Sequence, residues 1–437
     1  MSVSDTIAAI ATPPGKGGIG VIRLSGSQAI SIAQDLCDVQ LKPRQAQYVK
    51  FANNQKEIID TGLALYFVGP NSFTGEDVVE LHGHGGPIVQ DQLMACVIAA
   101  GARQARAGEF SQRAYLNDKI DLTQAEAIAD LIDSGTQQAA RGAMRSLQGE
   151  FSKKIESLLK ELIYLRMYVE AAIDFPDEEI DFLADDKIRN SIQTLQQSFA
   201  KTIRQAGQGA ILRNGLTLAI AGKPNAGKSS LLNALSGYEA AIVTDIAGTT
   251  RDTISETIDI DGLPVHIVDT AGLRDSDDTV EKIGIERAHK AIESADHTLL
   301  VCDANDGLAP LQLSAKHTTI YNKIDLIEDI NCSHLEGLSV SAKTGEGIQK
   351  LRTYIKQLAG LEQSTESLFT ARRRHLSALQ KAEAAINLGL QQLTLHNAGE
   401  LLADELLQAQ NALNDITGEF TADDLLGEIF SGFCIGK

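Results

Sequence analysis

Residues 216–235 read Leu216-Thr-Leu-Ala-Ile-Ala-Gly222-Lys-Pro-Asn-Ala-Gly227-Lys228-Ser229-Ser230-Leu-Leu-Asn-Ala-Leu235. An apolar run of strand length precedes the two glycines, and apolar residues at helical spacing follow them. Glycines at this spacing before Lys-Ser allow backbone N–H groups to surround a polyphosphate at a helix N-terminus. The stretch therefore predicts a phosphate-binding loop in an α/β domain, with Lys228 reaching the β- and γ-phosphates and Ser229 completing a Mg²⁺ shell.

Two further motifs follow in the order expected of a guanine-nucleotide domain. Gly248-Thr-Thr250 precedes an expected strand at residues 254–260, and a threonine hydroxyl there can join Mg²⁺ and sense the γ-phosphate. Asp269-Thr-Ala-Gly272 follows an expected strand at residues 265–268. Its carboxylate can hold the metal shell and its last N–H can touch the γ-phosphate.

Base recognition is predicted for Asn322-Lys-Ile-Asp325, which follows an expected strand at residues 318–321. The Asp325 carboxylate can accept two hydrogen bonds from guanine N1–H and its exocyclic amine, which adenine cannot supply. Ser341-Ala-Lys343 adds a backbone contact to the guanine carbonyl oxygen. The residues expected to contact GTP are Asn225, Ala226, Gly227, Lys228, Ser229, Ser230, Thr244, Asp245, Ile246, Ala247, Gly248, Thr249, Thr250, Asp269, Thr270, Ala271, Gly272, Asn322, Lys323, Asp325, Ser341, Ala342 and Lys343.

Hydrolysis needs a residue that orients water, and the position where Ras-like enzymes carry glutamine holds Leu273. Glu281, which opens a helix-like run, can align water, or it can simply be an acidic residue favoured at a helix N-terminus. Asn225 also has two interpretations. Either its side-chain amide caps the turn, or its amide oxygen binds a monovalent cation that takes the place of an arginine finger.

Composition indicates a folded, multidomain protein. The chain has 437 residues, 43% hydrophobic and 22% charged, with a formal net charge of −19 that argues against coating nucleic acid by bulk electrostatics. No apolar run reaches transmembrane length and the first residues lack a basic leader pattern, so we expect a cytoplasmic protein without a membrane partner. The five scattered cysteines suggest neither a disulfide framework nor a zinc site.

Domain boundaries follow from changes in the spacing of apolar residues along the chain. Residues 1–118 alternate strand-like runs (6–11, 20–24, 61–68 and 77–81) with helix-like runs (27–37 and 87–100), which indicates an α/β domain. Helical spacing marks residues 119–214 and returns at 358–437, flanking an α/β block at 215–357. We therefore predict a multidomain α/β plus all-α chain, in which a Ras-like P-loop G domain is inserted into a discontinuous helical bundle.

Several side chains have both a functional and a structural interpretation. His82 and His84 could bind a metal, but a role in a glycine loop is favoured because no further ligand pair accompanies them. Cys434 is a small hydrophobic residue or a reactive thiol in the tail. Two basic groups meet RNA phosphates or form solvated faces: Arg103, Arg106 and Arg113, and the run Arg372-Arg-Arg-His375.

The whole chain resembles the tRNA-modification GTPase family MnmE, also called TrmE. The resemblance rests on GIGVIR, TGEDVVELHGHGG, GEFSQRAYLNDKIDLTQAEA, GKPNAGKSS, TDIAGTTRD, DTAGLR and the terminal FCIGK. It implies an N-terminal tetrahydrofolate-binding domain that drives homodimerisation and G domains that meet on activation. With the FAD- and NADH-using partner MnmG, in a heterotetramer, the family modifies C5 of the wobble uridine of certain tRNAs with an aminomethyl-type group.

The resemblance also implies roles for individual residues. Arg23, Glu80, Lys119 and Lys437 are expected to hold 5-formyltetrahydrofolate or a related tetrahydrofolate. Mg²⁺ is assigned to Ser229 and Thr250, and K⁺ to Asn225, Thr244, Ile246 and Thr249. Glu281 is expected to orient the water, with Thr250 and Gly272 completing the catalytic set, and Cys434 becomes a candidate functional thiol.

A potassium-stimulated GTPase acting in tRNA modification is therefore the leading hypothesis. The alternative is a GTP-dependent switch for ribosome or other RNA assembly, without a role in the modification chemistry. A folate-dependent one-carbon enzyme is a weaker third option, because it would leave the G domain without a purpose. The connection at residues 303–317 is shorter than the helix-containing segment that a G domain normally carries.

Overall fold

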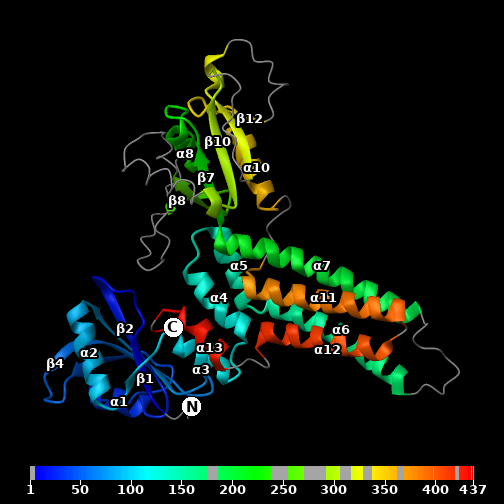
Figure 1. Ribbon diagram of the computed structural model, residues 1–437. Helices are drawn as coiled ribbons and strands as arrows, with labels where there is room; N and C mark the ends of the chain where they lie inside the picture. Colours follow the sequence, from blue (N-terminus) through cyan, green and yellow to red (C-terminus); the bar gives the residue numbers. More distant parts are fainter. Residues whose placement is uncertain are drawn as a thin grey trace, which may run out of the picture. The chain divides into compact units, whose positions relative to one another are not determined.

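The computed structural model describes residues 5–174, 186–237, 254–269, 292–305, 316–327, 337–361, 369–396, 398–418, 423–434 and 436 (Figure 1). The chain divides into two compact units, residues 1–129 with 410–437 and residues 130–409. In the described part, no helix is both long enough and apolar enough to cross a bilayer. The predicted fold class is confirmed, because two separate six-stranded sheets accompany a set of long helices.

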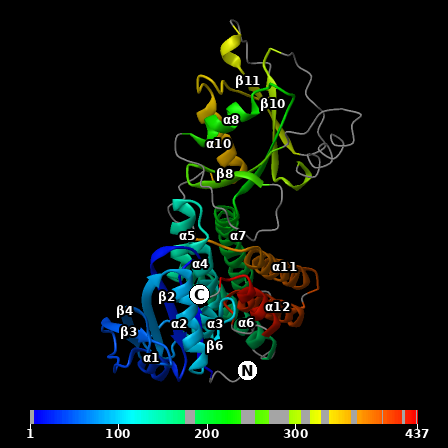
Figure 2. The ribbon, with the colours of Figure 1, turned by 90° about the vertical axis from the view of Figure 1, so that its left-hand side faces the viewer.

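The first unit is built on a mixed sheet in the order β3-β4-β5-β2-β1-β6. The helices α1 and α2 cover one face, where Ile22, Leu81 and Leu93 belong to one fully buried cluster. Figure 2 shows both helices alongside this sheet. The strands and helices are β1 (Ile7–Ile10), β2 (Gly17–Ser25), α1 (Ala29–Cys37), β3 (Gln47–Ala52), β4 (Ile58–Phe67), β5 (Val78–Gly85), α2 (Pro87–Ala99), β6 (Arg103–Gln104) and α3 (Glu109–Leu116).

The structure differs from the predicted strands at the glycine-rich patches. The strand expected to end at residue 81 continues as β5 to Gly85, so His82 and His84 lie in a strand and not in a glycine loop. The glycines make this pairing possible, because a Cβ on Gly85 would lie 2.7 Å from the carbonyl oxygens of Gly17 and Ile19. Strand β3 and helix α3 were not predicted.

The C-terminus returns to the first unit through α13 (Asp423–Ser431). Its Phe430 packs in a buried cluster with Leu122 and Phe433, and the Phe430 and Phe433 rings lie 5.3 Å apart. Gly108, at φ 65°, begins α3 where a Cβ would lie 2.9 Å from the Phe433 Cβ. Residues at opposite ends of the sequence therefore share one core.

The helices of the middle of the chain carry one apolar stripe each, as their spacing predicts. Helix α7 packs against both α6 and α11, and Figure 1 shows these three running side by side. Buried residues Leu162, Phe199 and Ile386 come from these three helices. The bounds are α4 (Leu122–Ile132), α5 (Gln137–Leu147), α6 (Glu150–Asp174), α7 (Asp186–Asn214), α11 (Arg373–His396) and α12 (Gly399–Thr417).

The second sheet has the order β12-β11-β10-β7-β9-β8, and all neighbours are parallel except β8 and β9. Parallel strands place their carboxyl ends at one edge, which is where α/β folds bind ligands. Its elements are β7 (Leu216–Ala221), α8 (Lys228–Ser236), β8 (Ile254–Ile260), β9 (Leu263–Asp269), β10 (His297–Asp303), β11 (His317–Asn322), the 3₁₀ turn η1 (Ile324–Leu326), β12 (Leu338–Ser339) and α10 (Ile348–Leu358).

Two glycines of α7 differ in how closely they pack against the segment at Phe369, through which the chain returns from this sheet to the helices. A Cβ on Gly209 would lie 2.0 Å from the Phe369 carbonyl oxygen, whereas nothing lies within 4 Å of a Cβ on Gly207. We expect Gly209→Ala to cost about 1–3 kcal/mol through overpacking. Gly207→Ala is expected to stabilise the same helix by about 0.5–1 kcal/mol. Thermal unfolding midpoints should move in opposite directions, and equal shifts would contradict the packing described here.

Candidate functional site

The loop predicted to bind phosphate lies between β7 and α8, so the predicted order of strand, loop and helix is found. Gly222 has φ 150°, and a Cβ there would lie 2.1 Å from the Val301 carbonyl oxygen of β10. Gly227 has φ 89° and is the N-cap of α8. Asn225 adopts φ 63°, a conformation that asparagine tolerates better than most residues. Glycine at 222 and 227 and asparagine at 225 therefore suit the backbone at these three positions, and the backbone cradle suits a polyphosphate.

Lys228 begins α8 and folds back over the loop. Its Nζ donates to the carbonyl oxygens of Gly222 at 2.8 Å and Lys223 at 3.0 Å. The ammonium group is therefore held above the N-terminal end of the helix, where a phosphate gains from both the N–H groups and the positive charge. Ser229 follows in the first turn, which suits its predicted place in a Mg²⁺ shell.

Asn322 joins the phosphate loop to the segment around Ser341. Its Nδ2 donates to the Ala226 carbonyl oxygen at 3.0 Å, and its Oδ1 accepts from the Ala342 N–H at 3.0 Å. The side chain is 1% exposed, so both bonds are shielded from water. One amide thus ties together three loops that follow separate strands.

Asp325 lies beside Ser341, whose hydroxyl donates to Asp325 Oδ1 at 2.6 Å. This bond orients the carboxylate and leaves its other oxygen outside that contact. Both residues belong to the loops at the carboxyl edge of the second sheet. A cavity of about 1130 Å³ lies there, lined among others by Gly227, Ser230, Asn322, Lys323, Asp325, Ala342 and Lys343. Its size is appropriate for a nucleotide.

Lys323, at φ 67°, is held by a carboxylate that the sequence did not single out. Its Nζ lies 2.7 Å from Asp303 Oδ2, at the end of the neighbouring strand β10. The hydrogen bond from Lys323 lowers the pKa of the Asp303 carboxyl below its ordinary value. An acidic residue at the end of a strand adjacent to Asn322 was the signal that could have identified it.

Part of the predicted site lies outside the described residues. This applies to residues 244–250, 270–272 and 281, which include the proposed water-orienting glutamate and three of the four proposed K⁺ ligands. Asp269 ends β9 next to Ile220 of β7, as a carboxylate reaching the phosphates would require, but its side chain is outside the described set. Lys437 and most of the 303–317 connection also lie outside it.

A second group of predicted residues lies on the first unit. Glu80 Oε1 accepts from Arg23 Nε at 3.0 Å and Nη2 at 2.8 Å, and Glu80 Oε2 lies 3.2 Å from His82 Nε2. The Arg23 guanidinium also lies 5.7 Å from the centres of the Phe73 and Phe110 rings. The planar cation is thereby held rigidly, and cation–π contacts of this kind stabilise a partly buried charge.

Lys119 lies at the loop that carries Phe73. Its Nζ donates to the Pro70 carbonyl oxygen at 2.9 Å. Arg23 and Lys119 thus contact the same loop, residues 69–76, from two elements. This loop is also fixed by Asn117, whose Nδ2 donates to the Thr74 carbonyl oxygen at 2.7 Å. Arg23 and Lys119 are therefore connected through one short segment, and Glu80 joins them through its pair with Arg23.

Cys434 is exposed and borders a different cavity of about 800 Å³. The turn before β2, at residues 12–17, lines this cavity together with Gln90 and Met94 of α2. Arg23, Glu80 and Lys119 are not among its lining residues. The C-terminal tail is joined to the start of α3 by a hydrogen bond from the Gly108 N–H to the Cys434 carbonyl oxygen at 3.3 Å.

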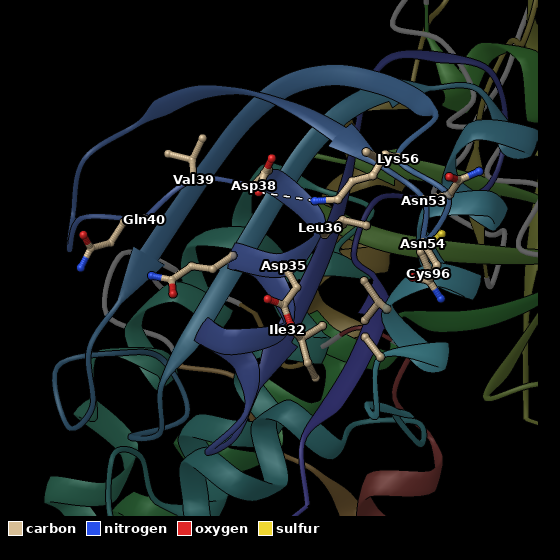
Figure 3. A pocket seen from close by; sticks show the side chains of 14 residues that line it. Ile32, Asp35, Leu36, Asp38, Val39, Gln40, Asn53, Asn54, Lys56 and Cys96 are labelled. Atoms are coloured by element: carbon tan, nitrogen blue, oxygen red, sulfur yellow. Dashed lines mark ion pairs between the residues drawn. The ribbon is translucent and has the colours of Figure 1, made fainter.

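Another hollow of about 620 Å³ lies at the C-terminal ends of α1 and α2 (Figure 3). Polar side chains dominate its rim, including Asp38 and Lys56, which form an exposed ion pair at 3.5 Å. Cys96 lies at its wall, and burial raises the pKa of that thiol. None of the predicted site residues lines it.

The two histidines considered as metal ligands have protein partners. His82 bonds Glu80, as described above, and His84 Nδ1 lies 2.7 Å from Asp60 Oδ1. Asp60 also accepts the His84 backbone N–H at 2.7 Å. Although burial of Asp60 opposes ionisation, these bonds lower the pKa of its carboxyl overall. No group of three potential ligands occurs among the described residues.

Most of the basic residues considered for RNA contact serve internal interactions. Arg113 is nearly buried and contacts Asp5, Glu76 and Glu109, while Arg103 pairs with two of the same carboxylates. In the other group, Arg372 bonds Asp130 and His375 lies 5.1 Å from the Phe151 ring. These side chains hold the fold together, which lowers their availability for phosphates.

Comparison with known proteins gives matches along the whole chain. The family profile described as the MnmE helical domain matches residues 122–434, and that of the GTP-binding protein TrmE N-terminus matches residues 6–119. The tRNA modification GTPase MnmE of Ectopseudomonas mendocina is 56% identical over 99% of both chains. That of Marinomonas sp. is 54% identical over 99% of this chain and 98% of the relative.

Two solved structures, with low TM-scores, are similar to part of the chain. The G domain of the T. maritima FeoB iron transporter is 27% identical, with a TM-score of 0.25, and covers 33% of this chain and 98% of its own. Aquifex aeolicus Era bound to GDP·AlF4⁻ is 27% identical, with a TM-score of 0.26, over 39% of this chain and 67% of its own.

Proposed function

Since this chain belongs to the MnmE family of tRNA modification GTPases, we propose that its hydrolysis of GTP drives modification at C5 of the wobble uridine of certain tRNAs. The product is of the aminomethyl or carboxymethylaminomethyl type. The partner in the reaction is the FAD- and NADH-using flavoprotein MnmG, in a heterotetramer. The protein acts in the cytoplasm as a homodimer. That it is a GTP hydrolase in tRNA modification follows from the family.

The observation that carries the proposal is the cluster of Asn322, Asp325 and Ser341 at the edge of the second sheet. Asn322 fixes the phosphate loop relative to the base-reading loops through two bonds of 3.0 Å. Asp325, oriented by Ser341, offers acceptors that match the N1–H and amine of guanine. A rigid carboxylate of this kind discriminates strongly against adenine. The geometry supports GTP as the nucleotide that drives the cycle.

Hydrolysis is assigned to residues around the phosphate loop. We propose that Lys228 stabilises charge on the phosphates, that Ser229 and Thr250 hold Mg²⁺, and that Glu281 orients the water. Mg²⁺ supplies neutralisation of the charge that develops on the phosphate oxygens. Asn225, whose φ of 63° turns the loop, offers its amide oxygen to K⁺. When bound, K⁺ would supply the positive charge that an arginine finger supplies in other GTPases.

The one-carbon donor is assigned to the first unit. Arg23, Glu80, Lys119 and Lys437 are proposed to hold a tetrahydrofolate, and Cys434 is the candidate functional thiol. Support comes from the rigid Arg23–Glu80 pair, because a fork of donors fixed by a carboxylate suits a ligand carrying both amides and carboxylates. Bound folate supplies the carbon that is transferred. The residues named here bind and orient it.

Analysis of tRNA nucleosides by mass spectrometry tests the proposal. Cells that lack the protein should carry an unmodified wobble uridine. Expression of the native chain in these cells should restore the modification. Arg23→Lys keeps the charge but loses the fork, so it should restore less of the modified nucleoside. Arg44→Lys is the matched control, because Arg44 also lies over a phenylalanine ring, 5.9 Å from the centre of Phe67, but is outside the proposed site.

The outcomes separate the parts of the proposal. If nucleosides were unchanged in cells lacking the protein while their ribosome profiles changed, a switch in RNA assembly would replace the modification role. If Arg23→Lys restored modification as fully as Arg44→Lys, the folate site would not involve Arg23.

A further inference from the structure

The β8–β9 hairpin connects the two predicted nucleotide-sensing loops to one turn. Strand β8 begins at Ile254, shortly after Thr250, and β9 ends at Asp269, where the Asp269–Gly272 motif begins. The strands pair from Ile254 with Val268 to Ile260 with Leu263. The turn at Asp261 and Gly262 is therefore at the opposite end of the hairpin from both loops.

The turn makes a specific contact with α5 inside the second unit. Thr136 Oγ1 donates to the Gly262 carbonyl oxygen at 2.9 Å and accepts from the Ala139 N–H at 3.1 Å. Thr136 is the N-cap of α5 and is 94% buried, since its relative exposure is 6%. The Gln138 side chain packs directly on Gly262, since a Cβ on Gly262 would lie 2.2 Å from the Gln138 Cγ. One hydroxyl thus caps the helix and binds the turn at the same time.

The turn is also fixed to the helices of its own sheet. Arg352 of α10 donates to Asp261 Oδ1 at 2.9 Å and to the Leu235 carbonyl oxygen at 3.0 Å. Leu235 lies in α8, the helix that begins at the phosphate loop. Asp261 and Gly262 therefore belong to a turn that is held from two sides, by α10 and by α5.

Helix α5 in turn contacts the segment where the chain leaves the second sheet. Thr370 donates its N–H to the Gly142 carbonyl oxygen at 3.3 Å, and the Ser146 hydroxyl donates to the Thr370 carbonyl oxygen at 3.0 Å. Arg372 and Arg213, which stand at the two passages between sheet and helices, share Asp130 Oδ1 at 2.7 and 2.6 Å. The Asp130 side chain is 4% exposed. Asp130 lies in α4, the helix before α5, so α4 contacts both passages, whereas a displacement of α5 would act directly on the passage at Thr370.

We propose that Thr136 is the point at which the nucleotide state of the G domain is transmitted to the helical domain, through the β8–β9 turn and α5. This deepens the proposed function, since it requires the predicted loops to respond to GTP. A threonine suits this place because its hydroxyl binds both elements, so a shift of the turn must either move the helix start or break its cap.

Hydrogen exchange of the full chain, with and without the non-hydrolysable analogue GMPPNP and Mg²⁺ in potassium buffer, tests this. In the native protein, the nucleotide should change exchange in residues 137–147. Thr136→Val removes the hydroxyl and should abolish this difference while leaving GMPPNP affinity unchanged. Thr136→Ser keeps the hydroxyl and should retain it. Gln137→Ala is the control, since Gln137 is exposed and adjacent to Thr136.

Each outcome decides the matter. A native α5 that exchanges equally with and without nucleotide, or a Thr136→Val protein that keeps the full difference, would overturn the proposal. If Thr136→Val does not fold, Gln138→Ala, which weakens packing on Gly262, replaces it. This variant should reduce the nucleotide-dependent difference in exchange of residues 137–147, and an undiminished difference would contradict the proposal. A native protein that binds no GMPPNP in calorimetry would instead refute the proposed GTP site.

Discussion

Asp325→Asn is expected to weaken GTP binding by about 10²- to 10⁴-fold and to create binding of xanthosine triphosphate. Two hydrogen bonds to a charged acceptor are each worth about 1.5–3 kcal/mol, and each 1.4 kcal/mol is a factor of ten in affinity. Xanthine carries a carbonyl where guanine has its amine. An asparagine amide can donate to that oxygen while its own carbonyl still accepts from N1–H.

Calorimetry with GTP, ATP and xanthosine triphosphate measures this exchange of specificity. The gain of a new ligand excludes general misfolding as the cause of the lost GTP affinity. Asp303→Asn is the matched control, because Asp303 lies on the neighbouring strand, bonds Lys323 and is not among the residues expected to contact the base. It should lose far less affinity and gain no xanthosine triphosphate. Undiminished GTP binding by Asp325→Asn would refute the assignment of the base site.

Exchanging potassium for sodium is expected to slow GTP turnover by about 10²–10³-fold, the cost of losing one preorganised charge stabiliser. The ion is proposed to rest on the Asn225 amide oxygen and on ligands from residues 244–249. Sodium is smaller and cannot contact the same set of oxygens together. Asn225→Gly isolates this effect, because glycine adopts the φ of 63° without strain and lacks only the amide.

Asn225→Gly should turn over GTP slowly and at equal rates in the two salts, while its GTP affinity stays near that of the native chain. Lys223→Ala, at an exposed position in the same loop, should keep the full potassium response. Equal rates in potassium and sodium for the native protein would remove the cation from the mechanism. A potassium response that persists in Asn225→Gly would move the ion to other ligands.

The sequence predicted the second sheet better than the first. The expected strand over 254–260 is β8, and those at 265–268 and 318–321 lie within β9 and β11. These strands are apolar runs bounded by recognisable loops. Strand β3 was missed because Tyr48 and Lys50 are exposed and only Val49 and Phe51 are buried, which leaves a short and weak alternation.

In the first sheet, glycines led to a wrong prediction from local propensity. The segment from His82 to Gly85 looks like a loop, since glycine is unfavourable in strands. Its strand conformation depends on β2 and β4, whose backbones approach so closely that side chains would not fit: a Cβ on Gly62 would lie 1.9 Å from the His82 carbonyl oxygen. Such close approach is a property of the assembled sheet and cannot be read from neighbouring residues.

What the sequence determined by itself is the nucleotide chemistry and the family. The phosphate loop and the guanine motifs are each local, since the residues of one motif lie within a few positions of each other along the chain. Tertiary structure alone decided that Asn322 would tie Ala226 to Ala342, and that Asp130 would receive arginines 83 and 242 residues away. Those contacts depend on which strands and helices become neighbours. A buried polar group needs a hydrogen-bond partner, and the fold decides which residues are close enough to provide one.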